Sequence, residues 1–273
     1  MEFGCHRPTL DLRDFKLAKT TVSNAVLPQE YSCPNKMAVK DQMLVSSCVA
    51  HAMSSILEYH AVSPVKLSTN FIYGSQRKLF NRTSKGMFLR DACKIAADYG
   101  DMLLEDCTGN TEVPACFEKA EAALADQTKL NKAKVFRVLK YFNCTSIDDI
   151  KYTLFNHGPV LASLRWYKNY TTKLDGTLTG KQKGDYGYHA FVIYGYNAEG
   201  FLCQNSWGVL WGKLGKFILP YDIALADAWG FIDVDNDDEV RELIETKPNR
   251  VIDILFKILN ALINFFTKVF DRK

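Results

Sequence analysis

Acyl transfer through a thiol needs a nucleophile whose sulfur is easily ionised, and the run DQMLVSSCVAHAMSS offers one. Cys48 precedes apolar residues that recur at helical spacing, so we expect it in the first turn of a helix. Unpaired N–H groups and the helix dipole stabilise a thiolate there, and the thiolate is the attacking species. A buried thiol at a helix start remains the alternative, because most free cysteines behave as small apolar residues.

The partners of such a nucleophile come from two later runs. YHAFVIYGYN puts His189 at the start of an apolar strand, and GFLCQNSWG puts Asn205 at the end of the next one. A turn at NAEG would make these strands antiparallel and bring their outer ends together. Asn205 would then orient His189 as general base, while Gln42 and the Cys48 backbone N–H would donate to the developing oxyanion.

One other histidine competes for the role of base. His51 lies three residues after Cys48, and residues at this spacing are neighbours on a helix. It shares the helix with the thiol, and no residue in the sequence is evident as its orienting partner. We therefore expect His51 to be packed or hydrogen-bonded within the helix.

The elements that must position these residues change in type along the chain. Apolar periodicity predicts helices at about 47–61, 68–80, 86–100, 115–130 and 146–158. Runs rich in β-branched and aromatic residues predict strands within 133–142, 158–167, 188–197, 200–208, 215–222 and 228–234. Helices first and strands second indicate an α+β fold with two lobes.

The same patterns divide the chain into four parts. We expect a lead-in over residues 1–39, a helical lobe over 40–130 with the nucleophile, and a β lobe over 131–235 with the histidine and asparagine. An acidic linker and a helical tail would follow over 236–273. In 249–273 polar residues recur every three or four positions, which predicts an amphipathic helix with a wide apolar face.

That apolar face has two uses that the sequence leaves open. It would pack on the protein itself or on a second copy, or it would lie in a membrane interface. The tail carries too many polar groups for a helix that spans a membrane.

Composition narrows the classes of function. Hydrophobic residues make up 47% of the chain and charged residues 24%, which is typical of a globular protein. A net charge of +3 without a basic stripe argues against a nucleic-acid partner. The eight cysteines form no CxxC pair and no cluster with zinc spacing, so we expect no metal and no organic cofactor. The charged N-terminus lacks the apolar run of a secretory signal, which favours a reducing, intracellular location.

Three motifs together carry a family resemblance. DQ followed by SSCVAHA, then HAFVIYGY and QNSWGVLWGKLGKFIL, resemble the papain-like cysteine peptidases, the family of papain and the lysosomal cathepsins, over about residues 27–235. The resemblance implies a helical N-terminal lobe and an antiparallel, β-barrel-like C-terminal lobe. It also implies a thiol endopeptidase or exopeptidase that acts on a protein or peptide substrate through an acyl-enzyme.

The resemblance further implies a substrate cleft. Trp207 would cover the hydrogen bond between asparagine and histidine and border the leaving group. The backbone of Gly86 would pair with an extended substrate. Phe88, Ser163 and Ala190 would line the pocket for the second residue before the scissile bond.

The chain departs from the family around the nucleophile. The family usually reads Cys-Gly-Ser-Cys-Trp, and the matching residues here are Val45-Ser46-Ser47-Cys48-Val49. The family disulfide at this place therefore cannot form. The altered motif keeps two alternatives open: a catalytically weak papain-like binding or assembly protein, and an isopeptidase or transferase that uses the same thiol.

The region before the nucleophile also differs from the family. A long inhibitory propeptide does not fit into the 47 residues before Cys48. We expect residues 1–26 to form a short lid over the cleft instead.

Overall fold

A computed structural model describes residues 3–9, 14–16, 26–34, 37–61, 64–109 and 115–232. Residues 1–233 form one compact unit. The acidic linker and the amphipathic helix predicted within 236–273 lie outside the described residues. Within the described part, no helix is both long and apolar enough to cross a membrane.

The described helices confirm most of the helical predictions. Their bounds are α2 Cys48–His60, α3 Thr69–Phe80, α4 Leu89–Asp98, α5 Ala115–Ala125, α6 Gln127–Ala133 and α7 Ile147–Asn156, with a 3₁₀ turn η1 at Lys134–Phe136. The single helix predicted over 115–130 is two helices. Asp126 separates them, because its side chain accepts hydrogen bonds from the N–H groups of Thr128 and Lys129 and so starts a new helix.

The strands follow mainly in the second half of the chain. Their bounds are β1 Tyr31–Ser32, β2 Lys140–Asn143, β3 Val160–Tyr167, β4 Thr171–Thr172, β5 Leu178–Thr179, β6 Tyr186–Tyr196, β7 Gly200–Gln204, β8 Lys216–Pro220 and β9 Leu225–Ile232. The strand predicted within 133–142 is shorter than expected, because its first residues continue the helical region through η1. β1 comes from the lead-in, so part of that segment belongs to the sheet.

Antiparallel pairing joins the strands into one main sheet. Its order is β2-β9-β3-β6-β7-β8, with β1 added to β6, and β4 and β5 form a separate pair. β6 and β7 are antiparallel neighbours, as the NAEG turn predicted. The predicted histidine, His189, lies on β6, and the predicted asparagine, Asn205, directly follows the neighbouring strand β7.

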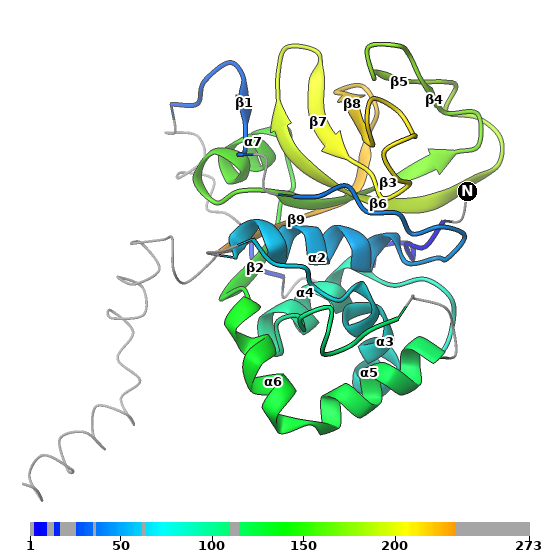
Figure 1. Cartoon of the computed structure of the whole chain (residues 1–273). Helices are drawn as coiled ribbons and strands as arrows, with labels where there is room; N and C mark the ends of the chain where they lie inside the picture. Colours follow the sequence, from blue (N-terminus) through cyan, green and yellow to red (C-terminus); the bar gives the residue numbers. More distant parts are fainter. Residues whose placement is uncertain are drawn as a thin grey trace, which may run out of the picture. The chain divides into compact units, whose positions relative to one another are not determined.

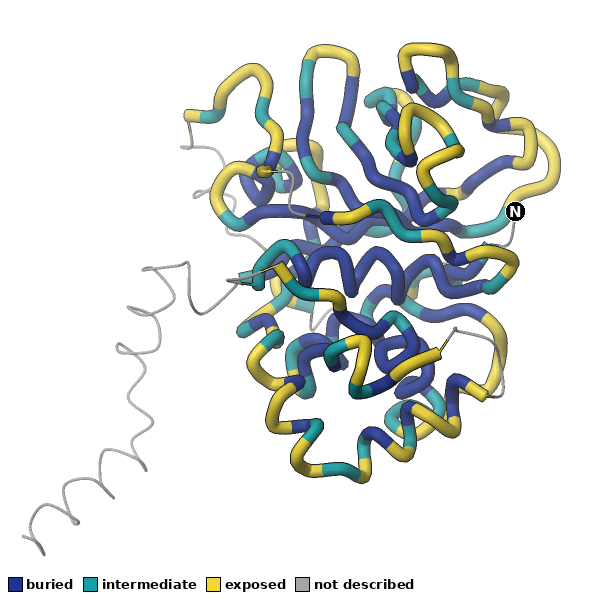
Figure 2. Tube along the Cα trace, viewed as in Figure 1, coloured by how far each residue is buried: buried dark blue, intermediate teal, exposed yellow. Residues whose placement is uncertain are grey.

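Helix α2 lies at the centre of the unit formed by residues 1–233. It packs against β6 on one side and against α3 and α4 on the other, and Figure 1 shows it between the sheet and the remaining N-terminal helices. Its residues from Cys48 to Glu58 are all buried, and Figure 2 shows the helix buried along most of its length. The first turn of α2 therefore faces the sheet where the two lobes meet.

Candidate active site

The thiol of Cys48 lies at the start of α2, and Ser47 is the N-cap residue. The cysteine is 0% exposed. The backbone N–H of Ala190, on β6, points to its sulfur at an N–Sγ distance of 3.4 Å. Because Ala190 directly follows His189, this contact brings the helix start and the histidine together.

His189, inside β6, meets Asn205, which directly follows β7. The His189 Nε2 lies 2.7 Å from the Asn205 Oδ1, and the amide oxygen can only accept, so Nε2 carries the hydrogen. In a neutral imidazole the lone pair is then on Nδ1. This nitrogen is buried and has no hydrogen-bond partner among the described residues. The ring is therefore oriented with its basic nitrogen available to take a proton.

Aromatic rings enclose this hydrogen-bonded pair. Trp207 stacks on the His189 ring with a centroid distance of 4.3 Å and an interplanar angle of 27°. Trp166 meets both rings edge-on, at 5.2 Å from His189 and 5.0 Å from Trp207. The sequence analysis missed Trp166, although it lies in a predicted strand, because the strand pattern does not tell which aromatic residue faces the histidine.

Gln42 is held by the NSWG motif. Its Oε1 accepts from the Ser206 hydroxyl at 2.7 Å, and its backbone N–H donates to the Ser206 carbonyl at 2.8 Å. Its side-chain amide donates to the Val45 carbonyl at 2.8 Å, within the loop that leads to Cys48. The Ser206 N–H also donates to the Asn205 Oδ1 at 2.8 Å. Ser206 thus links Gln42 to Asn205, a role that the sequence analysis did not assign although the residue is part of the motif.

Burial governs the ionisation of the two reacting groups. It raises the pKa of the Cys48 thiol to about 11, although N–H groups including those of Ala190 and Gly4 act in the opposite direction. It also lowers the pKa of His189 to about 4, with the Asn205 hydrogen bond acting against the shift. In this closed arrangement both groups are neutral at pH 7, and opening the site to water would favour the ion pair.

The residues predicted to bind substrate come from both lobes, and among them Ala190 contacts the Cys48 sulfur through its N–H. Gly86 has φ +93°, a conformation that suits glycine, and its N–H donates to the Tyr73 hydroxyl at 3.0 Å. Phe88 directly precedes α4. Ser163 and Ala190 are buried register partners on β3 and β6. Gly86 and Phe88 thus come from the helical side and the other two from the sheet.

His51 has partners within its own helix. Its Nδ1 lies 2.9 Å from the Ser47 carbonyl oxygen and 3.2 Å from the Ser47 hydroxyl. The prediction of a hydrogen-bonded helix residue is confirmed. Among the residues that the structure describes, no group of three or more histidine, cysteine, aspartate or glutamate side chains could hold a metal ion.

The sequence matches a known family over most of its length. A family model described as papain family cysteine protease matches residues 27–224. An uncharacterized peptidase C1-like protein of Acanthamoeba polyphaga mimivirus is 26% identical over 210 residues, which cover 69% of this chain and 66% of that protein. A cathepsin B-like cysteine proteinase of Haemonchus contortus is 26% identical over 121 residues, which cover 43% of this chain and 35% of the other. The chain thus spans less than two thirds of the length of these relatives.

Solved structures share the fold. Xylellain, a cysteine protease from Xylella fastidiosa, superposes with a TM-score of 0.71 at 21% identity, covering 85% of this chain and 96% of that one. Procathepsin L 3 of the Tenebrio molitor larval midgut gives a TM-score of 0.63 at 17% identity, covering 81% and 74%. The helical lobe, the antiparallel sheet and the family match lead to one conclusion. This chain belongs to the papain family of cysteine proteases.

Proposed function

We propose that this chain hydrolyses peptide bonds by acyl transfer through Cys48, with His189 as general base and acid. The observation that carries the proposal is the 2.7 Å hydrogen bond between His189 and Asn205, next to a thiol held by the N–H of Ala190. A nucleophile, a base and an orienting group in this order are the recurring parts of acyl-transfer sites.

The reaction follows from the roles of these groups. His189 Nδ1 takes the proton of Cys48, and the sulfur bonds to the carbonyl carbon of the scissile peptide. Gln42 and the Cys48 backbone N–H donate to the resulting oxyanion. As the C–N bond breaks, His189 returns its proton to the leaving amine. Water then attacks the thioester with His189 as base, and the acid product and the free thiol are released.

Trp207 has a supporting role in this scheme. Its ring stacks on His189 and excludes water from the hydrogen bond to Asn205. Gly86, Phe88, Ser163 and Ala190 bind the substrate on the acyl side of the scissile bond. Neither a metal nor an organic cofactor takes part in any step.

A thiol-directed epoxide and a mixture of peptides test the proposal together. The wild-type chain should form an adduct on Cys48, located by peptide mapping, and should cleave peptides at internal or terminal bonds that mass spectrometry identifies. The Cys48→Ala variant should do neither. Incubation for hours allows for the burial of the thiol. A wild-type chain that forms no adduct and cleaves nothing would favour the binding or assembly alternative.

A further inference from the structure

A second cavity, with a volume of about 400 Å³, lies outside the proposed active site. Three parts of the chain form its walls: Arg7 and Pro8, side chains of β3 and β6, and residues 223–226 at the start of β9. Of the described residues that line it, none is proposed to react or to bind substrate. Its chemistry can therefore be considered separately from that of Cys48.

The charge of this cavity is positive. Among the described residues that line it, Arg7 and Arg165 are the charged ones and no side chain is acidic. Both arginines are exposed, and neither forms an ion pair with a carboxylate in the described part of the chain. A guanidinium presents several N–H donors in one plane, which fits the oxygens of a phosphate, sulfate or carboxylate. An anion is therefore the group that this wall can bind.

Tyrosines hold Arg165 in place. It lies opposite Tyr188 in the pairing of β3 and β6, and its guanidinium is 4.6 Å from the centre of the Tyr186 ring. The hydroxyls of Tyr167 and Tyr188 lie beside the guanidinium and raise the pKa of Arg165 above its ordinary value. A guanidinium that is already positioned loses less conformational freedom when an anion binds.

Tyr170 adds a polar group that has no partner. The residue is 3% exposed, and its buried hydroxyl forms no hydrogen bond within the described part of the chain. A buried polar group without a partner destabilises the protein. A ligand oxygen at this wall would accept the missing hydrogen bond.

Rings and aliphatic side chains surround these polar groups: Tyr167, Tyr170, Tyr188, Pro8, Ile223 and Leu225. Pockets for small organic molecules start at about 300 Å³, so the cavity has room for more than a bare oxyanion. An aromatic ring would pack favourably against the tyrosines. The walls thus fit an anion that is attached to an aromatic body.

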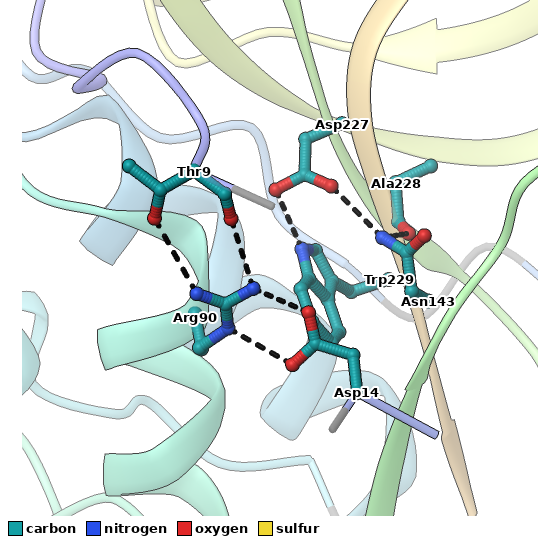
Figure 3. Close-up of polar contacts among 7 residues, drawn as sticks. All are labelled: Thr9, Asp14, Arg90, Asn143, Asp227, Ala228 and Trp229. Carbon is teal, nitrogen blue, oxygen red and sulfur yellow. Dashed lines mark hydrogen bonds and ion pairs between the residues drawn. The ribbon is translucent and has the colours of Figure 1, made fainter. Parts of the chain in front are cut away.

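The wall that carries Arg7 is anchored by Arg90, as Figure 3 shows. From the first turn of α4 the Arg90 guanidinium donates to the Thr9 carbonyl at 3.0 Å and binds both carboxylate oxygens of Asp14. Such charge-assisted, two-pronged contacts fix geometry well. They hold the backbone directly after Arg7 and Pro8 in place.

The wall at the start of β9 is anchored by Asp227, which directly follows Ala226. Its carboxylate accepts hydrogen bonds from the Trp229 Nε1 at 2.8 Å and from the Asn143 Nδ2 at 2.9 Å, also visible in Figure 3. The Arg90 guanidinium lies 5.5 Å from the centre of the Trp229 ring and so joins the two anchors. The cavity is thus largely preformed, as is usual for small-molecule sites.

We propose that this cavity binds an aromatic oxyanion such as an aryl phosphate, with the negative group at Arg7 and Arg165 and the ring against the tyrosines. The site is separate from the proposed peptidase site. The inference therefore does not depend on peptide hydrolysis, and binding can be measured on an inactive variant.

Isothermal titration calorimetry of the full-length chain with phenyl phosphate tests the proposal. Inorganic phosphate and phenol, the two halves of the probe, are titrated in parallel. Arg165→Gln removes a charge of the cavity, and Tyr170→Phe removes only the unpartnered hydroxyl. The matched control is Arg77→Gln, because Arg77 also stacks on an aromatic ring, Phe117, but does not line the cavity. Cys48→Ala shows whether binding involves the proposed nucleophile.

We expect wild type to bind phenyl phosphate more tightly than either half of the probe. The Kd should rise roughly 10-fold or more in Arg165→Gln, because charge-assisted hydrogen bonds to the anion are lost. It should rise about 3-fold to 10-fold in Tyr170→Phe, which loses one hydrogen bond. Arg77→Gln and Cys48→Ala should bind as wild type does.

Equal Kd values in wild type and Arg165→Gln would overturn the proposal, as would no measurable binding of phenyl phosphate at millimolar concentration. Loss of binding in Cys48→Ala would also overturn it, because the ligand would then occupy the active site. If circular dichroism shows that Arg165→Gln does not fold, an unchanged Kd in Tyr170→Phe decides against the proposal. Inorganic phosphate that binds as tightly as phenyl phosphate would overturn the assignment of an aromatic body.

A peptide with an internal phosphotyrosine forms a second arm, because the same chemistry occurs on proteins and on free small molecules. Tighter binding than that of phenyl phosphate would assign the ligand to a protein side chain, and weaker binding would assign it to a small molecule. Either result supports an aromatic oxyanion as the ligand.

Discussion

Asn205 determines which nitrogen of His189 can act. With Nε2–H donated to the amide oxygen, the proton-accepting nitrogen is Nδ1, and the ring cannot turn without breaking a 2.7 Å hydrogen bond. Ser206 reinforces this arrangement, because its N–H binds the same amide oxygen and its hydroxyl binds Gln42. One tripeptide, Asn205–Trp207, thus contacts the proposed base, the proposed oxyanion donor and the face of the His189 ring.

Gln42 gives the first prediction at this scale. Replacing it with alanine removes a donor to the oxyanion, which typically lowers kcat about 10²-fold to 10³-fold. KM should change little, because the interaction forms fully only in the transition state. Steady-state kinetics with a cleaved peptide would measure both constants. As a control, Gln76→Ala removes another fully buried glutamine, on α3, and should leave kcat near the wild-type value. A Gln42→Ala enzyme with an unchanged kcat would contradict the proposed role.

The buried histidines predict how stability depends on pH. Burial lowers the pKa of His51 and of His189 from 6.5 to about 4. Between about pH 6.5 and about pH 4 each of these histidines is protonated in the unfolded chain but neutral in the folded one. The free energy of unfolding should therefore fall, as pH drops, by up to about 1.4 kcal/mol per pH unit for each histidine.

Urea denaturation at several pH values would measure this loss. His51→Gln removes one of the two titrating groups without touching the proposed catalytic residues. The free energy of unfolding of wild type minus that of the variant isolates the histidine from the carboxyl groups, and it should decrease as pH drops from about 6.5 towards about 4, because only the wild type loses the contribution of His51. A difference that does not depend on pH would contradict the prediction.

At the scale of elements, close packing of α3 on α5 depends on Gly74. A Cβ on Gly74 would overlap the Cys116 carbonyl oxygen and lie 2.6 Å from the Ala120 Cβ. Alanine normally favours a helix interior over glycine by about 1 kcal/mol. At Gly74 the overlap with the Cys116 backbone should outweigh this preference, so that alanine destabilises the protein.

We therefore predict that Gly74→Ala lowers the free energy of unfolding by about 1–3 kcal/mol, the usual cost of overpacking a core. Chemical denaturation monitored by tryptophan fluorescence would measure it. Lys78→Ala, at an exposed position of the same helix, should change stability by less than about 0.5 kcal/mol. A stabilised Gly74→Ala protein would show that helix propensity outweighs the contact.

At the scale of the whole molecule, the two lobes pack against each other without a disulfide between them. All eight cysteines are buried and none is in a disulfide. The sheet supplies one core cluster and the surroundings of α2 supply another, with α2 packed against β6 between them. We predict that the eight cysteines stay unpaired in solution as well.

The melting temperature should therefore be the same with and without a reducing agent. Alkylation followed by mass spectrometry should add eight groups after unfolding in denaturant alone. Finding fewer than eight without reductant, and eight with it, would reveal a disulfide and contradict the prediction.

The sequence predicted the elements where a single local signal was strong. Helices α2, α3, α4 and α7 and strands β3 and β6 to β9 lie within or close to the predicted ranges. The errors fall at residues 115–142, where Asp126 caps a new helix and where β-branched Val135 lies in a 3₁₀ turn before β2. Both outcomes depend on how a short segment meets its neighbours, which periodicity does not contain.

The sequence by itself predicted the reacting groups that we propose: a cysteine at a helix start, a histidine on one strand, and an asparagine at the end of the next. These motifs are local, so their residue types and spacing can be read along the chain. The sequence also led us to expect that residues 1–26 cover the cleft, but only the tertiary structure decided that Gly4 fits against Ser46 and that Arg90 binds Asp14. Contacts between residues about 40 to 180 positions apart in sequence arise from packing of the lobes, and the pattern of either partner alone does not encode them.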